Sequence, residues 1–356
     1  MSCKRFGNFN ISGIDFIMAA MKMVLMGTGT SHGVPVVSCT CEVCRSPHKE
    51  DKRLRCSAYV ENGGNSSGAW DSEPGTEAVF PTTNVVIDVG PEFRIQALST
   101  GIMRLDGVLI THSHADHCHG LDDIRIFSHT RPAQVSDGTD LSDADEEMMR
   151  HIQRRRSNWR QESVGKGIPI FANDIALNDI AHKFDYVFHP RSLGGGIPKM
   201  NLIDCARYSP SDELCLGSLR IFPVPMMHGT LPTVGWVLHG AGSNHAIAYL
   251  TDCSSIPDSS LGIILNSGLV LDHLVIDALR VRPHSTHCCF SEAMSYAERL
   301  GATHTWFTHM THDLFHTEIQ SYIDSRLRDF PSLSGIVSRG GSVSPAYDGL
   351  VLLTEK

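Results

Sequence analysis

Short aliphatic runs bounded by Gly, Asp, Thr or His recur along most of the chain. They lie at residues 22–26, 84–88, 107–111, 167–171, 219–224, 246–250 and 305–307. Runs this short, rich in Val, Ile, Leu and aromatic residues, are typical of strands buried on both faces. The pattern therefore predicts several short strands gathered into sheets.

Two helices are predicted toward the C-terminal end of the chain. Ser291 can cap a helix that runs to Leu300, and Gly301 would end it. A second helix is predicted over residues 313–328, because its apolar side chains recur at helical spacing. These side chains are Phe315, Ile319, Tyr322, Ile323 and Leu327.

Two polar segments interrupt the apolar pattern. The first, near 62–80, contains a stretch rich in Gly, Ser, Asn and Glu at 62–77, which predicts a surface loop. The second, at 131–167, passes from an acidic part at 137–147 to a basic part at 150–160. Such separation of charge is typical of a solvated helix or a disordered segment. We expect both to be surface insertions, and the second is a candidate lid over a nearby site.

The remaining pattern fits one domain. At 356 residues the chain is somewhat long for a single domain, but residues 21–356 with the two insertions account for its length. The apolar stretch at 11–26 is interrupted by Asp15 and Lys22, so it predicts neither a signal peptide nor a membrane span. Residues 1–20 are predicted to form a disordered leader outside the fold.

The composition of the chain indicates which binding partners and which cellular compartment to expect. A formal net charge of −9, without a basic patch, disfavours nucleic acid as a partner, and no segment predicts membrane contact. The 11 cysteines include a cluster at metal-binding spacing, and others lie inside apolar runs. This usage indicates reduced thiols and a cytoplasmic protein, and it leaves a homodimer open.

The densest polar cluster lies at residues 111–117, Thr-His-Ser-His-Ala-Asp-His, directly after a buried run. A strand that ends in a tight loop can direct alternate side chains at different centres. His112 and His114 can therefore hold one metal ion while Asp116 and His117 hold a second. Imidazole and carboxylate ligands suit zinc and its first-row neighbours.

Two coordination shells need more than these four side chains. Three further residues are each the first metal-competent side chain after a strand-like run, and they are His228, Asp252 and His309. Loops at strand ends are where folds of this kind carry functional side chains. Their shared context predicts that all three join the same centre.

The order H-x-H-x-D-H, then His, Asp and His, resembles the metallo-β-lactamase superfamily. Within it, the segment Met-Gly-Thr-Gly-Thr-Ser-His-Gly-Val-Pro at 26–35 and the C-x-C-x-x-C spacing at 39–44 narrow the match. They are similar to the branch that contains the phosphoribosyl cyclic phosphodiesterase of phosphonate breakdown. Thr-His-Cys at 286–288 and Thr-His-Met-Thr-His at 308–312 also match that branch. The resemblance covers residues from about 23 to about 315, with insertions.

This resemblance implies an α/β fold, the metallo-β-lactamase αβ/βα four-layer sandwich, with metals at one edge of two packed sheets. It implies a dinuclear centre in which Asp252 bridges the two ions. The implied ligands are His112, His114, Asp116, His117, His228, Asp252 and His309. It also implies that His287 lies beside the substrate.

A separate structural zinc site is implied as well, and its residues are Cys39, Cys41, Cys44 and His312. The residue types agree with this role, because three thiolates and one imidazole complete a tetrahedral shell and leave no position for substrate. Reduced cysteines that merely pack in a loop are the alternative.

The expected activity is hydrolysis of a cyclic or small phosphodiester by a hydroxide that two divalent ions, zinc or manganese, activate. Asp116 and His287 are the candidate catalytic residues, and His287 would contact a phosphoryl oxygen or protonate the leaving alkoxide. His284 competes with His287 for this role. Three more histidines flank the motifs and are expected to be structural or to support ligands: His32, His119 and His316.

Other activities share parts of this pattern. A thioester or lactam hydrolase would use the same ligands but gives no reason for the cysteine cluster. A transfer-RNA 3'-processing endonuclease would need a basic RNA-docking arm. A flavodiiron redox protein would need Glu in place of His114.

Overall fold

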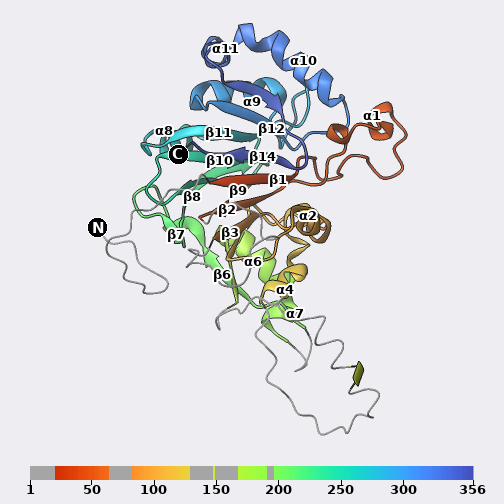
Figure 1. Ribbon diagram of the computed structural model, residues 1–356, viewed down its shortest axis with the longest axis vertical. Helices are drawn as coiled ribbons and strands as arrows, with labels where there is room; N and C mark the ends of the chain where they lie inside the picture. Colours follow the sequence, from red (N-terminus) through yellow and green to blue (C-terminus); the bar gives the residue numbers. More distant parts are fainter. Residues whose placement is uncertain (1–20, 64–81, 129–146, 149–166, 191–195, 356) are drawn as a thin grey trace.

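The computed structural model describes residues 21–63, 82–128, 147–148, 167–190 and 196–355. Two seven-stranded mixed sheets form the centre of the molecule, and helices lie outside them (Figure 1). The order of strands in the first sheet is β14-β1-β2-β3-β4-β5-β6, and in the second it is β13-β12-β11-β10-β9-β8-β7. In the first sheet, strands β3, β4, β5 and β6 run parallel to one another, and in the second, strands β10, β11, β12 and β13 do. The other neighbouring strands pair antiparallel.

The first sheet contains β1 (Lys22–Gly27), β2 (Ser57–Asn62), β3 (Thr83–Ile87), β4 (Gly107–Leu109), β5 (Ile168–Ala172), β6 (Met200–Asp204) and β14 (Leu350–Leu353). The second contains β7 (Leu214–Leu216), β8 (Leu219–His228), β9 (Leu231–Gly240), β10 (His245–Leu250), β11 (Val270–Asp277), β12 (His304–Thr308) and β13 (Ser342–Pro345). The longer helices are α2 (Phe93–Thr100), α6 (Asp174–Lys183), α8 (Asp258–Leu265), α9 (Phe290–Leu300), α10 (His316–Arg326) and α11 (Pro331–Ser338). Single-turn helices include α1 (Glu42–Arg45), α3 (Ala115–Cys118), α4 (Arg125–Ser128) and α7 (Asp185–Phe188).

Three apolar clusters hold the layers together. Ile87 packs between the two sheets with Trp236 and Tyr249, all fully buried. Its neighbour Val86 points the other way, into the layer that α2 and α6 cover, because side chains alternate along a strand. Ile276 packs beneath α8, α9 and α10 on the far side of the second sheet. Strands buried on both faces explain the aliphatic runs, and the four-layer α/β sandwich is confirmed.

The predicted strands are found within a few residues of their expected ends. The run at 107–111 leaves the sheet after Leu109, because the N–H of Thr111 donates to the side chain of Asp88 instead of to a neighbouring strand. Early departure from the sheet starts the loop that carries the histidine cluster.

The helix predictions need small corrections. Helix α9 begins at Phe290, one residue before Ser291, because Cys289 occupies the N-cap and its N–H donates to Glu292. Gly301 ends the helix in a left-handed conformation, as predicted. The helix predicted at 313–328 begins only at His316 and is continued by a 3-10 turn at 327–329, since the preceding residues belong to a loop held by other contacts.

Several sequence predictions concern residues outside the described ranges. The leader at 1–20 lies outside them, as does most of the insertions near 62–80 and 131–167, so these predictions remain untested. Among the described residues, no helix has both the length and the apolarity needed to cross a membrane.

Candidate metal centre

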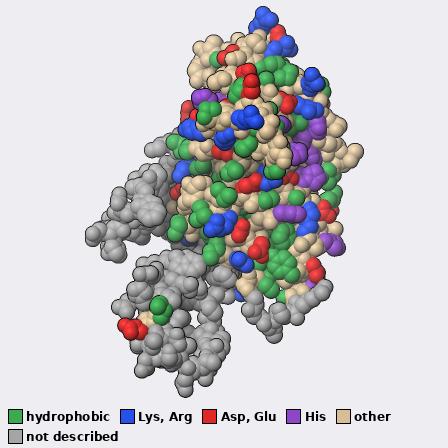
Figure 2. Space-filling view, turned by 90° about the vertical axis from the view of Figure 1, so that its right-hand side faces the viewer, with side chains coloured by type: hydrophobic (Ala, Val, Ile, Leu, Met, Phe, Trp, Pro, Cys, Tyr) green, Lys and Arg blue, Asp and Glu red, His purple; other side chains and the backbone are tan. Residues whose placement is uncertain are grey.

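The side chains of the predicted dinuclear centre gather where strands of both sheets end. His112 and the short helix α3 follow β4, His228 ends β8, and Asp252 and His309 follow β10 and β12. Parallel strands present their carboxyl ends at one edge of a sheet, and facing sheets bring two such edges together. On the face shown in Figure 2, several histidine side chains lie close together along the right-hand side.

The structure groups the predicted ligands into two sets around one shared carboxylate. One ligand atom each from His112, His114 and His228 lies within 4.8 Å of the others, and the same holds for Asp116, His117 and His309. The Oδ1 atom of Asp252 lies 3.3 Å from Nε2 of His117 and 3.1 Å from Nε2 of His309. Asp252 is also grouped with His112 and His117. The candidate groups overlap, since Asp252 also lies with Asp277, His287 and His309, and the split into two ion positions stays a prediction.

Unpaired nitrogens in this cluster fit a metal ion. Nε2 of His112 and Nδ1 of His309 are buried and have no hydrogen-bond partner among the described residues, and Nε2 of His117 and of His309 make no hydrogen bond although they lie 3.3 and 3.1 Å from Oδ1 of Asp252. Buried polar atoms are normally paired, since leaving one unpaired costs about 1–3 kcal/mol. Neutral imidazole and carboxylate are the donor set of zinc and manganese sites. The residues present therefore fit two divalent cations.

Hydrogen bonds behind the ligands fix which nitrogen faces the centre. Nδ1 of His117 lies 2.7 Å from Oδ2 of Asp88, a carboxylate that also accepts from the N–H and hydroxyl of Thr111. Nδ1 of His228 donates to the carbonyl of Thr286 at 2.6 Å. In both rings Nε2 is left for the centre, which is how metal-bound histidines are usually oriented.

Strained backbone is concentrated at the same place. Asp88, Asp252 and His309 have φ of 58°, 58° and 61°, a left-handed conformation that side chains other than Gly seldom adopt. Such strain persists only where surrounding contacts hold it, and it occurs most often at functional sites.

The surroundings of the histidines also shift their pKa values. Burial lowers the pKa of His309 to about 3 and holds the pKa of His112 well below its usual value, so both rings are neutral and able to bind a cation. Burial also opposes charge on His117, but the carboxylates of Asp252 and Asp88 raise its pKa well above the usual value. A cation at Nε2 of His117 would require the ring to be neutral, since a metal displaces the proton of its ligand.

His287 lies against the ligands, and His284 lies farther out. The His287 ring stacks on His309 with centroids 4.4 Å apart and meets His228 edge-on at 4.5 Å. Its Nδ1 is 2.8 Å from Oδ2 of the fully buried Asp277. His284 is exposed, and its ring centroid is 5.4 Å from that of His287. The geometry therefore favours His287 over His284 as the residue that would contact substrate.

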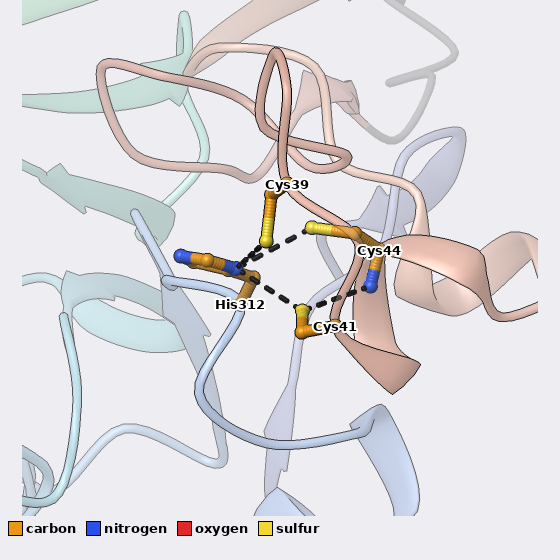
Figure 3. Close-up of side chains that lie close together, drawn as sticks. All are labelled: Cys39, Cys41, Cys44 and His312. Atoms are coloured by element: carbon orange, nitrogen blue, oxygen red, sulfur yellow. Dashed lines mark hydrogen bonds between the residues drawn. The ribbon is translucent and has the colours of Figure 1, made fainter.

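Cys39, Cys41, Cys44 and His312 form a second cluster, which we call the clip (Figure 3). The three sulfurs lie 3.5, 3.3 and 3.3 Å from Nδ1 of His312. Tetrahedral zinc, with Zn–S of about 2.3 Å and Zn–N of about 2.0 Å, would place its ligand atoms about 3.5 Å apart. The spacing fits one zinc ion.

The thiols of the clip differ in charge state. The N–H of Cys44 and the ring of His312 lower the pKa of Cys41 to about 6, whereas burial raises the pKa of Cys44 to about 11. Zinc binding would deprotonate every thiol it contacts.

A buried arginine joins the clip to the cluster of predicted metal ligands. The Nη1 atom of Arg53 donates to the carbonyl of Thr311 at 2.8 Å, between His309 and His312 in the chain. Its backbone N–H and carbonyl pair with Val34 in the N-terminal motif. The segment that carries one ligand of each cluster is thus attached to the loop that carries the cysteines.

Sequence reasoning missed several supporting residues. Asp88 and Asp277 each end a strand beside the site, which is the signal that identified Asp252, but neither lies in a histidine motif. Asp179 and Lys183 of α6 hold the histidine loop from outside. The Ser113 hydroxyl donates to Asp179 at 2.6 Å, and Lys183 donates to the Ser113 carbonyl. Only the fold brings α6 to this loop.

The three flanking histidines make other contacts. His119 is exposed and its ring meets Phe184 edge-on, whereas the N–H of His316 donates to Asp51 near the clip. His32 is exposed in the N-terminal motif. Supporting or structural roles remain the expectation for them.

The sequence is similar to those of known proteins. The sequence matches the beta-lactamase superfamily domain over residues 83–162 and 157–310. It is 28% identical over 293 residues to an octanoyltransferase of Porphyromonas gingivalis, which is 82% of this chain but 46% of that protein. The chain thus spans about half the length of the curated relative it matches.

Solved structures match over nearly the whole chain. A diphosphatase from the PhnP family is 30% identical, with a TM-score of 0.62, and the match covers 94% of this chain and 100% of that one. Zinc-bound PqqB from Methylobacterium extorquens is 15% identical, with a TM-score of 0.57 and coverage of 93% and 99%. The short form of human tRNase Z is 14% identical, with a TM-score of 0.51 and coverage of 93% and 98%. The last two show the fold alone.

Proposed function

The chain belongs to the metallo-β-lactamase superfamily, and from this premise we propose that it is a metal-dependent phosphodiesterase acting on a cyclic or otherwise small phosphodiester. The observation that carries the proposal is the pair of neighbouring ligand sets around Asp252, whose Oδ1 lies close to His117 and His309, with the ring of His287 stacked on His309. The diphosphatase of the PhnP family, 30% identical over nearly the whole chain, supports a substrate that is cleaved at a phosphoryl group.

His112, His114 and His228 would hold one ion, Asp116, His117 and His309 the other, and Asp252 would contact both. Two divalent ions in these positions would lower the pKa of a water molecule and neutralise charge on phosphoryl oxygens. The cysteine clip would hold zinc for structure, because its four ligands leave no open position.

His287 would contact the substrate's oxygens, and Asp277 would hold the ring of His287 from behind. Burial and the nearby Asp252 raise the pKa of Asp277 well above its usual value, so this side chain can remain a carboxylic acid that donates to Nδ1 of His287. Nε2 of His287 would then carry a hydrogen and donate to a phosphoryl oxygen. Donors fixed before the reaction stabilise the charge that develops on these oxygens. The same nitrogen would give its hydrogen to the departing alkoxide while Nδ1 takes up the proton of Asp277.

The net charge of the chain favours a small substrate. The net charge of −9 repels a polyanion such as RNA, so we favour a small phosphodiester over a transfer-RNA precursor. A small substrate needs only the local positive charge of the site.

Acyl thioester hydrolysis is a second candidate, since the P. gingivalis relative is an octanoyltransferase. That protein is about twice as long as the matched segment, so its name assigns no activity to this segment by itself. The same ligand cluster would serve a thioester carbonyl, so the substrate has to be tested directly.

The test is a comparison of kcat/KM for the full metal-loaded chain on four substrates. They are adenosine 2',3'-cyclic phosphate, bis(4-nitrophenyl) phosphate, an octanoyl thioester and a β-lactam. We expect the phosphodiesters to be preferred, and we expect His287→Gln to lower kcat more than it raises KM. A thioester hydrolysed with a higher kcat/KM than both phosphodiesters would replace the proposal with the second candidate.

A further inference from the structure

Helix α6 contacts both chain segments that carry one group of predicted ligands, which we call the three-histidine set: His112, His114 and His228. The helix covers the outer face of the first sheet, where Leu177 and Ile180 pack into the apolar layer (Figure 1). This packing fixes the helix, so its polar side chains can hold the loops at the edge of the sheet.

The first segment is the loop that follows β4. Ser113 lies between His112 and His114, and its hydroxyl donates to Oδ2 of Asp179 at 2.6 Å. The carbonyl of Ser113 accepts from Nζ of Lys183. Asp179 and Lys183 are four residues apart, so they lie on the same side of α6. The helix therefore holds Ser113 by its side chain and by its backbone.

The second segment is the hairpin formed by β8 and β9. Asn173 caps α6 by accepting from the N–H of Ala176, and its Nδ2 donates to the carbonyl of Pro232 at 3.1 Å. Pro232 is the second residue of β9, next to the residue that pairs with His228 at the end of β8. One helix thus contacts a loop of the first sheet and a hairpin of the second.

His114 depends on these contacts more than the rest of the three-histidine set does. Nδ1 of His112 lies 3.1 Å from Oγ1 of Thr111. Nδ1 of His228 donates to the carbonyl of Thr286. His114 is exposed, and its ring makes no hydrogen bond within the described ranges. The place of its ring is therefore set by the backbone that precedes it, which α6 holds.

The second group of predicted ligands, Asp116, His117 and His309, is held by other contacts. Nδ1 of His117 lies 2.7 Å from Oδ2 of Asp88, and the N–H of Met310, next to His309, donates into the N-terminal motif. In the part of the chain that the structure describes, no hydrogen bond or ion pair joins α6 to these three ligands. The contacts of α6 are thus confined to one of the two groups.

We propose that Asp179 and Lys183 are positioning residues for the three-histidine set, and that through them α6 raises the affinity of this set for a divalent cation without affecting the other group. Groups that hold ligands from behind keep them oriented, and losing one lowers metal affinity about 10- to 100-fold. Here the effect passes through the backbone of Ser113. The inference rests on the metal centre of the proposed function and does not depend on the substrate.

The test measures the affinity of one group at a time for Zn²⁺, by competition with a chromophoric chelator, in chains whose clip already holds one Zn²⁺. Asp116→Ala disables the second group, and in this background Asp179→Ala should weaken Zn²⁺ binding about 10- to 100-fold. His114→Ala disables the three-histidine set, and in that background Asp179→Ala should leave Zn²⁺ affinity unchanged.

Further variants, in the Asp116→Ala background, separate position from charge. Asp179→Asn removes the charge but keeps an oxygen that can accept from Ser113, so it should retain most of the affinity. Ser113→Ala should weaken binding as Asp179→Ala does, and the double variant should lose little more, because both changes remove one hydrogen bond. Lys183→Met should also weaken binding. Asn178→Ala, at an exposed position of the same helix, is the matched control and should bind Zn²⁺ like its parent.

Each outcome has a distinct meaning. Equal losses in the two backgrounds would indicate a general loss of stability and overturn the inference, as would no loss in either. An Asp179→Asn variant as weak as Asp179→Ala would overturn it too, since charge alone would then explain the effect. A wild type that cleaves no phosphodiester, but whose Zn²⁺ affinity responds as described, would refute the proposed substrate and leave the role of α6 intact.

Discussion

Replacing Arg53 with Met should destabilise the protein and loosen the segment that carries His309. The side chain of Arg53 is 0% exposed, and it lies 3.8 Å from Asp51 in addition to donating to Thr311 at 2.8 Å. Methionine keeps most of the volume but removes the charge. The Asp51 carboxylate would then be left buried without its cation.

The loss of stability depends on which hydrogen bonds Asp51 keeps in the variant. Removing one partner of a buried ion pair costs about 3–5 kcal/mol. Asp51 would still accept from the Ser46 hydroxyl at 2.6 Å and from the N–H of His316 at 2.7 Å, so the lower end applies. At this chain length, about 3 kcal/mol corresponds to a fall in Tm of about 6 °C.

Thermal unfolding of the zinc-loaded protein, with metal content measured in parallel, checks this expectation. Arg55→Met is the matched control, because Arg55 is two residues away, has a side chain 27% exposed, and pairs with Glu92 near the surface. A partly exposed pair contributes about 1 kcal/mol or less. Equal changes in Tm for the two variants would refute the reasoning, as would an Arg53→Met protein with unchanged metal affinity at the dinuclear site.

Three further variants probe separate parts of the account. Asp116→Ala should lower phosphodiester turnover by roughly a thousandfold or more while the apo protein keeps its Tm, since the carboxylate serves the metals and not the core; turnover near that of the wild type in a metal-verified sample would contradict it. Cys41→Ser should release about one zinc per chain, lower Tm and weaken activity indirectly, because zinc binding is coupled to local folding; unchanged zinc content would show that Cys41 is not a ligand. Asp348→Asn tests a buried acid: burial raises the pKa of Asp348 to about 7, so between about pH 4 and pH 7 the folded protein holds a proton that the unfolded chain has lost. Wild-type stability should therefore fall as pH rises through this window, and unfolding in denaturant at several pH values should show a smaller fall for the variant; identical slopes would contradict the assignment.

The sequence was sufficient for the strands and for the residues that follow them. His112, His228, Asp252 and His309 are each the first metal-competent residue after a buried run, and such runs are recognisable from composition alone. The clip was recognisable because its cysteine spacing is local, although the partnership with His312 came from the resemblance.

Residues that act across the fold could not be found in this way. Asp88 supports His117 from 29 positions away, and Arg53 contacts Thr311 from 258 positions away. Neither contact leaves a periodic pattern in the sequence. The start of α10 was placed three residues too early for a related reason, since helical spacing does not show that 313–315 belong to the loop beside the clip.

The central claim is that two ions held around Asp252 carry out phosphodiester hydrolysis. The most direct measurement is a metal titration of the stripped full-length chain, following bound metal and turnover of adenosine 2',3'-cyclic phosphate together. The account predicts that turnover rises as two ions per chain bind in addition to the clip zinc, and that Asp116→Ala neither binds the full complement nor turns over substrate at the wild-type rate. Full turnover while the dinuclear site is still empty would contradict it.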